Sequence, residues 1–343
     1  PTHFPYTTLF RSCGLICLVL WLSSCSDPDT VPETHISTPP VKAVTADVKA
    51  ATDEVERFPL RTALFGDLHV HTSWSADAYA GGNRLGPNSA YRFAKGEKVE
   101  LQTGDEAQLQ VPLDFVALTD HAEGFEVVHP CTMIPDSPEF DLQQCREMRS
   151  GDLDTATMLR QAFETAGVRP QPHQYDICSD DKRCQANALA TWQRVQAVAN
   201  AHDEPGRFTA LIAYEFSSLL TEFGMLHRNV IFRGTDVIPH AISSMDVRNQ
   251  ADFFDQLDAA CNEPCDVLTI PHNTTFSWGL TFSRTDEDGA AYTSEDLERR
   301  SRIERLFEVT QQKGNSECQI SVGAADEDCN VGNRFPPCEG EDD

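Results

Sequence analysis

The sequence predicts an α/β protein built on a parallel sheet or barrel. Three observations support this fold class: apolar runs of strand length recur, helical spacing of apolar residues separates several of them, and polar residues follow the runs abruptly. A nearly unbroken apolar run is typical of a strand that is buried on both faces. Because α/β folds place active sites at the C-terminal ends of their strands, we expect functional residues there.

The expected elements follow in chain order. Strands are predicted where apolar and β-prone residues cluster, at 62–71, 113–121, 208–215, 225–232, 265–273 and 305–309. Helices are predicted at 88–94, 155–166, 187–202, 251–260 and 295–304. In the helix at 187–202 the apolar spacing turns Trp192 inward. We expect a domain at 58–343, with an insertion at about 126–184 that covers the mouth of the site.

The first residues are excluded from the fold. Residues 1–12 resemble a translated sequencing adapter, and we interpret them as an artefact. Residues 13–25 join an apolar run, too short to span a bilayer, to a segment that resembles a bacterial lipobox and ends at Cys25. Residues 26–57 are rich in proline and threonine and are predicted to be a disordered tether.

These N-terminal features predict an exported bacterial lipoprotein. The signal peptide would end at Cys25, which would carry the lipid, and this anchor would be the only contact with the membrane. The protein would face the periplasm or the cell surface. Cysteine usage agrees with export, because short loops closed by disulfides are typical of oxidising compartments. The candidate cysteines form local couples, with connectivity left open: Cys131 with Cys145, Cys178 with Cys184, Cys261 with Cys265, and Cys318 with Cys329.

The charge balance argues against some classes of partner. The chain has 27 basic and 54 acidic residues, which gives a net charge of −27. We therefore expect no nucleic acid partner, because such a charge repels phosphate backbones. Bound metal ions would offset part of the charge, and most of the carboxylates are explained by solubility.

The functional prediction begins with His69 and His71. Side chains alternate along a strand, so two histidines one residue apart point the same way and can bind one cation together. The residues before the pair are β-prone, whereas those after it are polar, so the pair lies at a strand end. Two surface histidines on an edge strand would show the same spacing, so this pair alone leaves metal binding open.

Other histidines and one glutamate also lie at the ends of predicted strands. A single such histidine is more often a packed or surface residue than a ligand, but their joint occurrence favours one shared site. Six nitrogen or oxygen ligands exceed the need of one tetrahedral ion, so we expect two or three divalent ions of the Zn, Mn or Fe type. The six residues are His69, His71, His121, Glu215, His227 and His272.

Several motifs carry a resemblance to a known family. They are Gly-Asp-Leu-His-Val-His-Thr-Ser-Trp-Ser-Ala-Asp at 66–77, Ala-Leu-Thr-Asp-His-Ala-Glu at 117–123, Ala-Tyr-Glu-Phe-Ser-Ser at 213–218, Leu-His-Arg-Asn-Val-Ile-Phe-Arg at 226–233, and Ile-Pro-His-Asn at 270–273. Over about 60–340 the chain resembles the PHP (polymerase and histidinol phosphatase) superfamily of metal-dependent phosphoesterases. Within it, the chain is similar to the exported family of domain of unknown function 3604. The resemblance implies a distorted (β/α)7 TIM-like barrel of PHP type with three metal ions.

The resemblance also implies a distribution of the ligands. His69 and His71 would hold one ion, and Glu215 would bridge it to a second ion that His227 and His272 complete.

A third ion would be held by His121 together with Asp77, where many relatives have histidine. A carboxylate at that position favours harder ions such as Mn or Fe. The family closes its site with a late Asp-x-His pair, and no histidine follows His272. We therefore expect the barrel to be truncated at its C-terminal end and the fragment to be weak or inactive.

The implied chemistry is hydrolysis of a small phosphorylated substrate, a phosphate mono- or diester, by a hydroxide that bridges two ions. Arg228 would bind a phosphoryl oxygen, although a structural ion pair explains it equally well. Asp120 would orient His121 or move a proton. Two alternatives stay open: an amidohydrolase-like enzyme acting on C–N or C–O bonds, which lacks a candidate carbamylated lysine here, and a surface binding protein that keeps its metals structurally.

Overall fold

The computed structural model describes residues 62–151, 163–172, 178, 181–272, 274–311 and 314–315. All of them belong to the second of two units into which the chain divides, Pro39–Asp343. The predicted artefact, signal peptide, Cys25 and tether lie outside the described residues, as do Cys318, Cys329 and most of the helix expected at 155–166. Among the described helices, none is long and apolar enough to cross a membrane.

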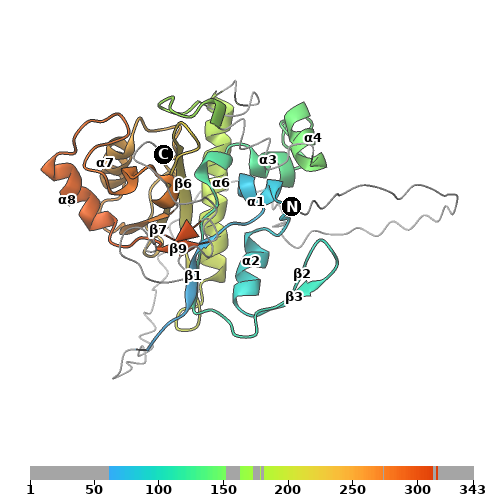
Figure 1. Cartoon of the computed structure of the whole chain (residues 1–343). Coiled ribbons are helices and arrows are strands. Elements are labelled where there is room, and N and C mark those ends of the chain that lie inside the picture. Colours follow the sequence, from blue (N-terminus) through green and yellow to red (C-terminus); the bar gives the residue numbers. More distant parts are fainter. Residues whose placement is uncertain are drawn as a thin grey trace, which may run out of the picture. The chain divides into compact units, whose positions relative to one another are not determined.

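A three-stranded parallel sheet forms one part of the fold, and its first strand, at 66–70, is labelled β1 in Figure 1. Its order is β1 (Gly66–Val70), β4 (Phe115–Leu118), β5 (Thr209–Leu211), and both pairs are parallel. The helices α2 (Pro87–Ala94) and α6 (Asp181–His202) lie in the connections between these strands and pack against β4 and β5. Parallel neighbours need such long crossovers, so this part of the molecule follows the predicted βαβ pattern.

The long helix α6 anchors the core beside the site. Trp192 points inward as predicted, is fully buried, and donates its indole N–H to the carbonyl of Ile238 at 2.9 Å. Its ring packs edge-on against Tyr214, with the ring centroids 5.5 Å apart. Because Tyr214 precedes Glu215 on a strand, packing of the tyrosine in the core turns the glutamate to the other face.

A three-stranded antiparallel sheet forms the second part. Its order is β6 (Ala213–Leu219), β7 (Met225–Phe232), β8 (Val267–His272). The loop at 220–224 joins β6 to β7 and is too short to hold a crossover helix, which makes the pair antiparallel. The register places His227 opposite His272, so two predicted ligands face the same side of this sheet.

The two sheets meet at the ends of β1 and β4. His121, just after β4, pairs with Glu215 of β6 in an isolated parallel bridge, and the amide N–H of Glu215 donates to the carbonyl of Asp120 at 3.0 Å. On the other side, the side-chain amide of Asn229 donates to the carbonyl of Leu68 at 2.9 Å. These bonds hold β1, β4, β6 and β7 around one point.

The expected (β/α)7 TIM-like barrel is wrong. The described strands form a parallel sheet, an antiparallel sheet and two small hairpins, and no described strand closes them into a barrel. The segment 305–309, predicted as a strand, has no regular structure and makes one backbone bond to β8, from the N–H of Glu308 to the carbonyl of Pro271 at 3.0 Å. A closed barrel would require a continuous ladder of backbone hydrogen bonds between this segment and its neighbouring strands. The fold is therefore mixed α/β.

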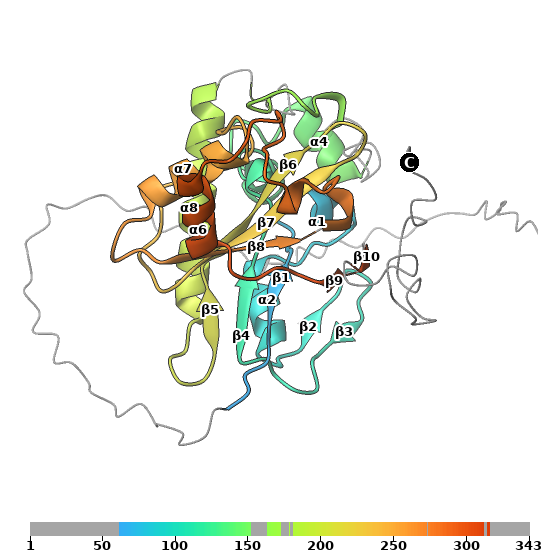
Figure 2. The same cartoon turned by 60° about the vertical axis from the view of Figure 1, so that its left-hand side comes forward.

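The remaining elements cover the sheets (Figure 2). The predicted helices at 251–260 and 295–304 are present as α7 (Gln250–Ala260) and α8 (Ser294–Ile303), and α8 begins with a capping box between Thr293 and Asp296. The shorter elements are α1 (Ala76–Ala80), β2 (Val99–Glu100), β3 (Glu106–Ala107), η1 (Ala122–Gly124), α3 (Val128–Met133), α4 (Gln143–Ser150), η3 (Thr274–Phe276), η4 (Leu280–Phe282), β9 (Thr310–Gln311) and β10 (Gly314–Asn315).

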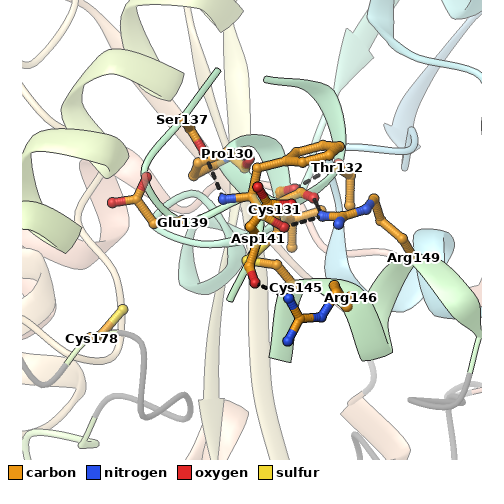
Figure 3. Close-up of a disulfide and its surroundings, with 12 residues drawn as sticks. Pro130, Cys131, Thr132, Ser137, Glu139, Asp141, Cys145, Arg146, Arg149 and Cys178 are labelled. Atoms are coloured by element: carbon orange, nitrogen blue, oxygen red, sulfur yellow. Dashed lines mark hydrogen bonds between the residues drawn. A yellow bond between two sulfur atoms is a disulfide. The ribbon is translucent and has the colours of Figure 1, made fainter. Parts of the chain in front are cut away.

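Three of the predicted disulfides are confirmed: Cys131–Cys145, Cys178–Cys184 and Cys261–Cys265. Figure 3 shows the first of them, which ties α3 to α4. Arg149 supports the same junction, because its Nη1 donates to the carbonyls of Cys131 and Phe140 at 2.6 and 2.7 Å. Disulfides of this kind are typical of proteins that fold in an oxidising environment.

Candidate metal centre

Glu215 is the central residue of the site. Its side chain is fully buried, on the face of β6 opposite to Tyr214 and Phe216. Its Oε1 lies 2.8 Å from Nδ1 of His227 and 3.0 Å from Nε2 of His272. Both histidines come from the antiparallel sheet, where the strand ladder fixes their separation from Glu215.

The other carboxylate oxygen of Glu215 faces the parallel sheet. Its Oε2 lies 2.8 Å from Nε2 of His71 and 3.3 Å from Nε2 of His69. The two rings are 5.3 Å apart, centroid to centroid, on the same side of the chain, as strand alternation predicts. His121 also approaches Glu215, with its Nδ1 3.5 Å from Oε1.

Asp77 is the second carboxylate of the cluster. It lies in the first turn of α1, where its Oδ2 is 3.0 Å from Nδ1 of His71 and 3.4 Å from Nε2 of His121. The hydroxyl of Ser75 donates to its Oδ1 at 2.7 Å and fixes its direction. The structure thus brings together all seven residues that the sequence singled out as metal ligands.

Two further residues of the cluster were missed. Glu308 places Oε2 2.7 Å from Nδ1 of His69, and Ser217 contacts Nδ1 of His121 and donates to Oε1 of Glu215 at 3.2 Å. Ser217 had a signal in the sequence, because it follows Glu215 by two residues and shares its face of the strand. Glu308 had none, because a lone glutamate near a strand end resembles an ordinary surface residue.

The electrostatics of the cluster come from burial opposed by close charge pairs. Burial raises the pKa of Glu215, but the histidines around it hold that pKa well below its usual range. Burial lowers the pKa of His69, yet Glu215 and Glu308 outweigh it and raise the value to about 9. For His272 burial prevails, and its pKa is lowered. A metal ion that binds to these histidines must displace the protons on their ligand nitrogens.

The donor set fits divalent metal ions. Three groups of side chains each place one nitrogen or oxygen per residue within 4.8 Å of one another. Two ligands of one tetrahedral ion lie roughly 3.4 Å apart, and the separations here are of that order. The groups differ from the expected distribution, because His69 joins His272 rather than His71. They are His69 with Glu215 and His272, His71 with Asp77 and His121, and His121 with Glu215 and His227.

A cavity of about 1060 Å³ opens beside the cluster. His69, His71 and Asp77 line it, together with Glu308 and Asn229. A substrate in this cavity would meet the metal ligands directly, which is the usual arrangement of an active site.

The structure corrects the expected role of Arg228. Its guanidinium is fully buried on the face of β7 opposite to His227, because neighbouring residues of a strand point to opposite faces. Its Nε donates to Glu304 at 3.0 Å and its Nη2 to Gln250 at 2.6 Å. Arg228 is therefore part of a structural ion pair in the core and does not reach the cavity.

The structure also corrects Asp120. Its carboxylate accepts hydrogen bonds from the amide N–H and the hydroxyl of Thr72, so it braces the loop after β1 rather than the ring of His121. Burial raises the pKa of Asp120 to about 6, although the Thr72 bonds oppose this. Asp120 acts on the cluster through the position of this loop.

Comparisons with known proteins give one match. The model of a family described as Protein of unknown function (DUF3604) matches residues 59–340. Neither the curated proteins nor the solved structures contain a match to the chain. Since the family model spans most of the sequence, the chain belongs to the DUF3604 family.

Proposed function

We propose that this protein is a metal-dependent hydrolase of phosphate mono- or diesters. The observation that carries the proposal is the convergence of five histidines on the buried Glu215, with Asp77 against two of these histidines, at the wall of a cavity. Burial of such a donor set costs free energy unless bound cations or protons compensate its carboxylates.

The chain's own residues would position the ions and the substrate. His69, His272 and Glu215 would hold one ion, and His71, Asp77 and His121 another. Bound divalent ions would lower the pKa of a water and neutralise charge on a phosphoryl oxygen. Glu308 would keep Nε2 of His69 directed at the cluster, because the bond from Nδ1 fixes the tautomer and the ring plane.

Two observations support phosphate esters over other substrates. The motifs around His69, His121 and His272 are similar to those of PHP phosphoesterases, and we propose that this family shares their metal chemistry. An amidohydrolase-type site would add a lysine, and no lysine is among the described residues that line the cavity. The three disulfides support the proposal that the enzyme is exported to an oxidising compartment, with a lipid on Cys25 as its anchor.

The proposal is tested by turnover. The full-length protein, purified, stripped of metal and then supplied with Mn, Zn or Fe, is assayed with p-nitrophenyl phosphate and bis(p-nitrophenyl) phosphate. We expect hydrolysis that needs added metal and that falls by at least about 100-fold in a His69→Ala/His71→Ala variant. His240→Ala is the control, because His240 is exposed and outside the cluster. Metal binding without turnover of either ester would contradict the proposal.

A further inference from the structure

The cavity beside the cluster has one apolar wall. The residues of this wall are Ile270, Leu306 and Phe307. Leu306 and Phe307 are 53% and 42% exposed, so both offer apolar surface to the cavity. Phe282 supports this wall from outside, with its ring edge-on to Phe307 at 5.5 Å between centroids. Exposed apolar surface at the rim of a polar site is typical of substrate contact.

Apart from the histidines of the cluster, the charged side chains that line the same cavity are all acidic. Asp67, Asp77 and Glu308 line it, and among the described lining residues there is no lysine or arginine. Arg84 follows the lining residue Asn83 in the chain, but its guanidinium lies over the ring of Tyr79, with Cζ 3.7 Å from the ring centroid. Any cationic contact to a phosphoryl group would therefore come from the ions alone, and a second phosphate or a carboxylate elsewhere on the substrate would meet like charge.

The size of the cavity agrees with a substrate that carries more than the reacting group. A volume of about 1060 Å³ exceeds what a single phosphate needs and reaches the upper range of small-molecule sites. A phosphate with organic groups on two of its oxygens would fill the cavity better than a phosphate with one.

From these observations we infer that the substrate is a phosphodiester, with one negative charge, whose non-reacting part is an uncharged apolar or aryl arm seated against Leu306 and Phe307. This inference rests on the proposed function and narrows it. Polyphosphates and nucleic acid strands carry several negative charges. They would meet the lining carboxylates of Asp67 and Glu308 and are therefore disfavoured.

The test measures binding rather than turnover, so that it stands apart from the test of the proposed function. Calorimetry with the manganese-loaded protein compares diphenyl phosphate, phenyl phosphate and dimethyl phosphate. We expect diphenyl phosphate to bind at least about tenfold more tightly than the other two, since it alone has one charge and two aryl arms. Tighter or equal binding of phenyl phosphate, or no binding of any of the three, would overturn the inference.

Variants of the wall sharpen this test. Phe307→Ala should weaken the binding of diphenyl phosphate by about fivefold to tenfold. The affinity for dimethyl phosphate should stay within about twofold of the wild-type value. Phe223→Ala is the control, because Phe223 is also an exposed phenylalanine, at 67% against 42% for Phe307, and lies outside the cavity lining, so this variant should change the binding of neither diester. Thr310→Lys, which puts a cation on the exposed rim, should tighten phenyl phosphate by about threefold to tenfold. Equal losses for both diesters in Phe307→Ala would contradict an aryl contact.

Discussion

The two sheets hold their parts of the cluster in different ways. The antiparallel sheet supplies Glu215, His227 and His272 from paired strands, where backbone ladders set their separations. The parallel sheet supplies His69 from the irregular part of β1, and His71 and His121 from positions just beyond its strands, where side-chain bonds replace the ladder. The first set is therefore fixed by the fold, whereas the second depends on local partners such as the carboxylates nearby.

Glu215→Gln is the sharpest test of the antiparallel set. The substitution keeps the shape but removes the charge from a residue that belongs to two of the three candidate metal groups. We expect bound metal to fall by at least one ion per chain and turnover to fall by about 1,000-fold, or about 4 kcal/mol. Metal analysis of the folded protein and the ester assay measure both. Glu298→Gln, on the exposed face of α8, should change neither, and an unchanged metal content in Glu215→Gln would contradict the central role.

Arg228→Leu tests the opposite face of β7. Loss of Arg228 removes one of the two cations paired with the buried Glu304, the other being Arg300, and takes a donor from Gln250, which should lower the free energy of unfolding by about 2 kcal/mol. Metal content of the folded protein should not change, because Arg228 lies away from the cluster.

The comparison for Arg228→Leu is the exposed pair of Arg233 and Asp266, 3.6 Å apart. Arg233→Leu should change the free energy of unfolding by less than about 1 kcal/mol. Denaturant unfolding of both variants measures the difference. Loss of metal from folded Arg228→Leu would show that the ion pair serves the site.

The ligands were predictable because their signal is local. His69 and His71 follow from strand alternation, and the motif residues His227 and His272 follow from their places in apolar runs. The pairing of the strands was not predictable in this way. The polar Ser217 and Ser218 made the third strand look finished at Glu215, whereas β6 continues to Leu219, since Ser217 is held by contacts within the cluster. The short turn at 220–224 then fixes an antiparallel pair that a pattern of alternating strands and helices conceals.

Glu308→Gln tests the parallel set at a residue that no motif marks. Among the described contacts, the bond from Glu308 to Nδ1 of His69 is the only hydrogen bond to that ring from a residue other than the seven predicted ligands. A glutamine keeps one acceptor but loses the charge, so metal affinity should fall by about tenfold and the pH profile of binding should shift, since the pKa of His69 depends on this carboxylate. Competition with a chelator measures the affinity. A Glu308→Ala variant that matches wild type would exclude the positioning role.

In the metal-free cluster the pKa values of the histidines differ between the two sets, and one experiment measures this difference. Burial lowers the pKa of His69, His71 and His121, but the carboxylates of Glu215, Asp77 and Glu308 outweigh it, and all three values are raised, for His69 to about 9. His272, on the antiparallel sheet, has its pKa lowered by burial. At pH 7 a metal ion must therefore displace a proton from His69, whose pKa is about 9, whereas the lowered pKa of His272 favours its neutral form.

Proton release on metal addition in a weakly buffered solution measures this difference. His69→Gln should lower the number released at pH 7 by about one, whereas His272→Gln should leave it unchanged. The direction of the pKa shift of His69 also determines how the stability of the metal-free protein depends on pH. Because the folded pKa of His69, about 9, lies above its ordinary 6.5, its contribution is fully present below pH 6.5 and is lost as the pH rises through about 9. Equal proton release by the two variants would mean that both sheets hold their histidines in one common charge environment, and the distinction between ladder-fixed and partner-fixed ligands would then fail.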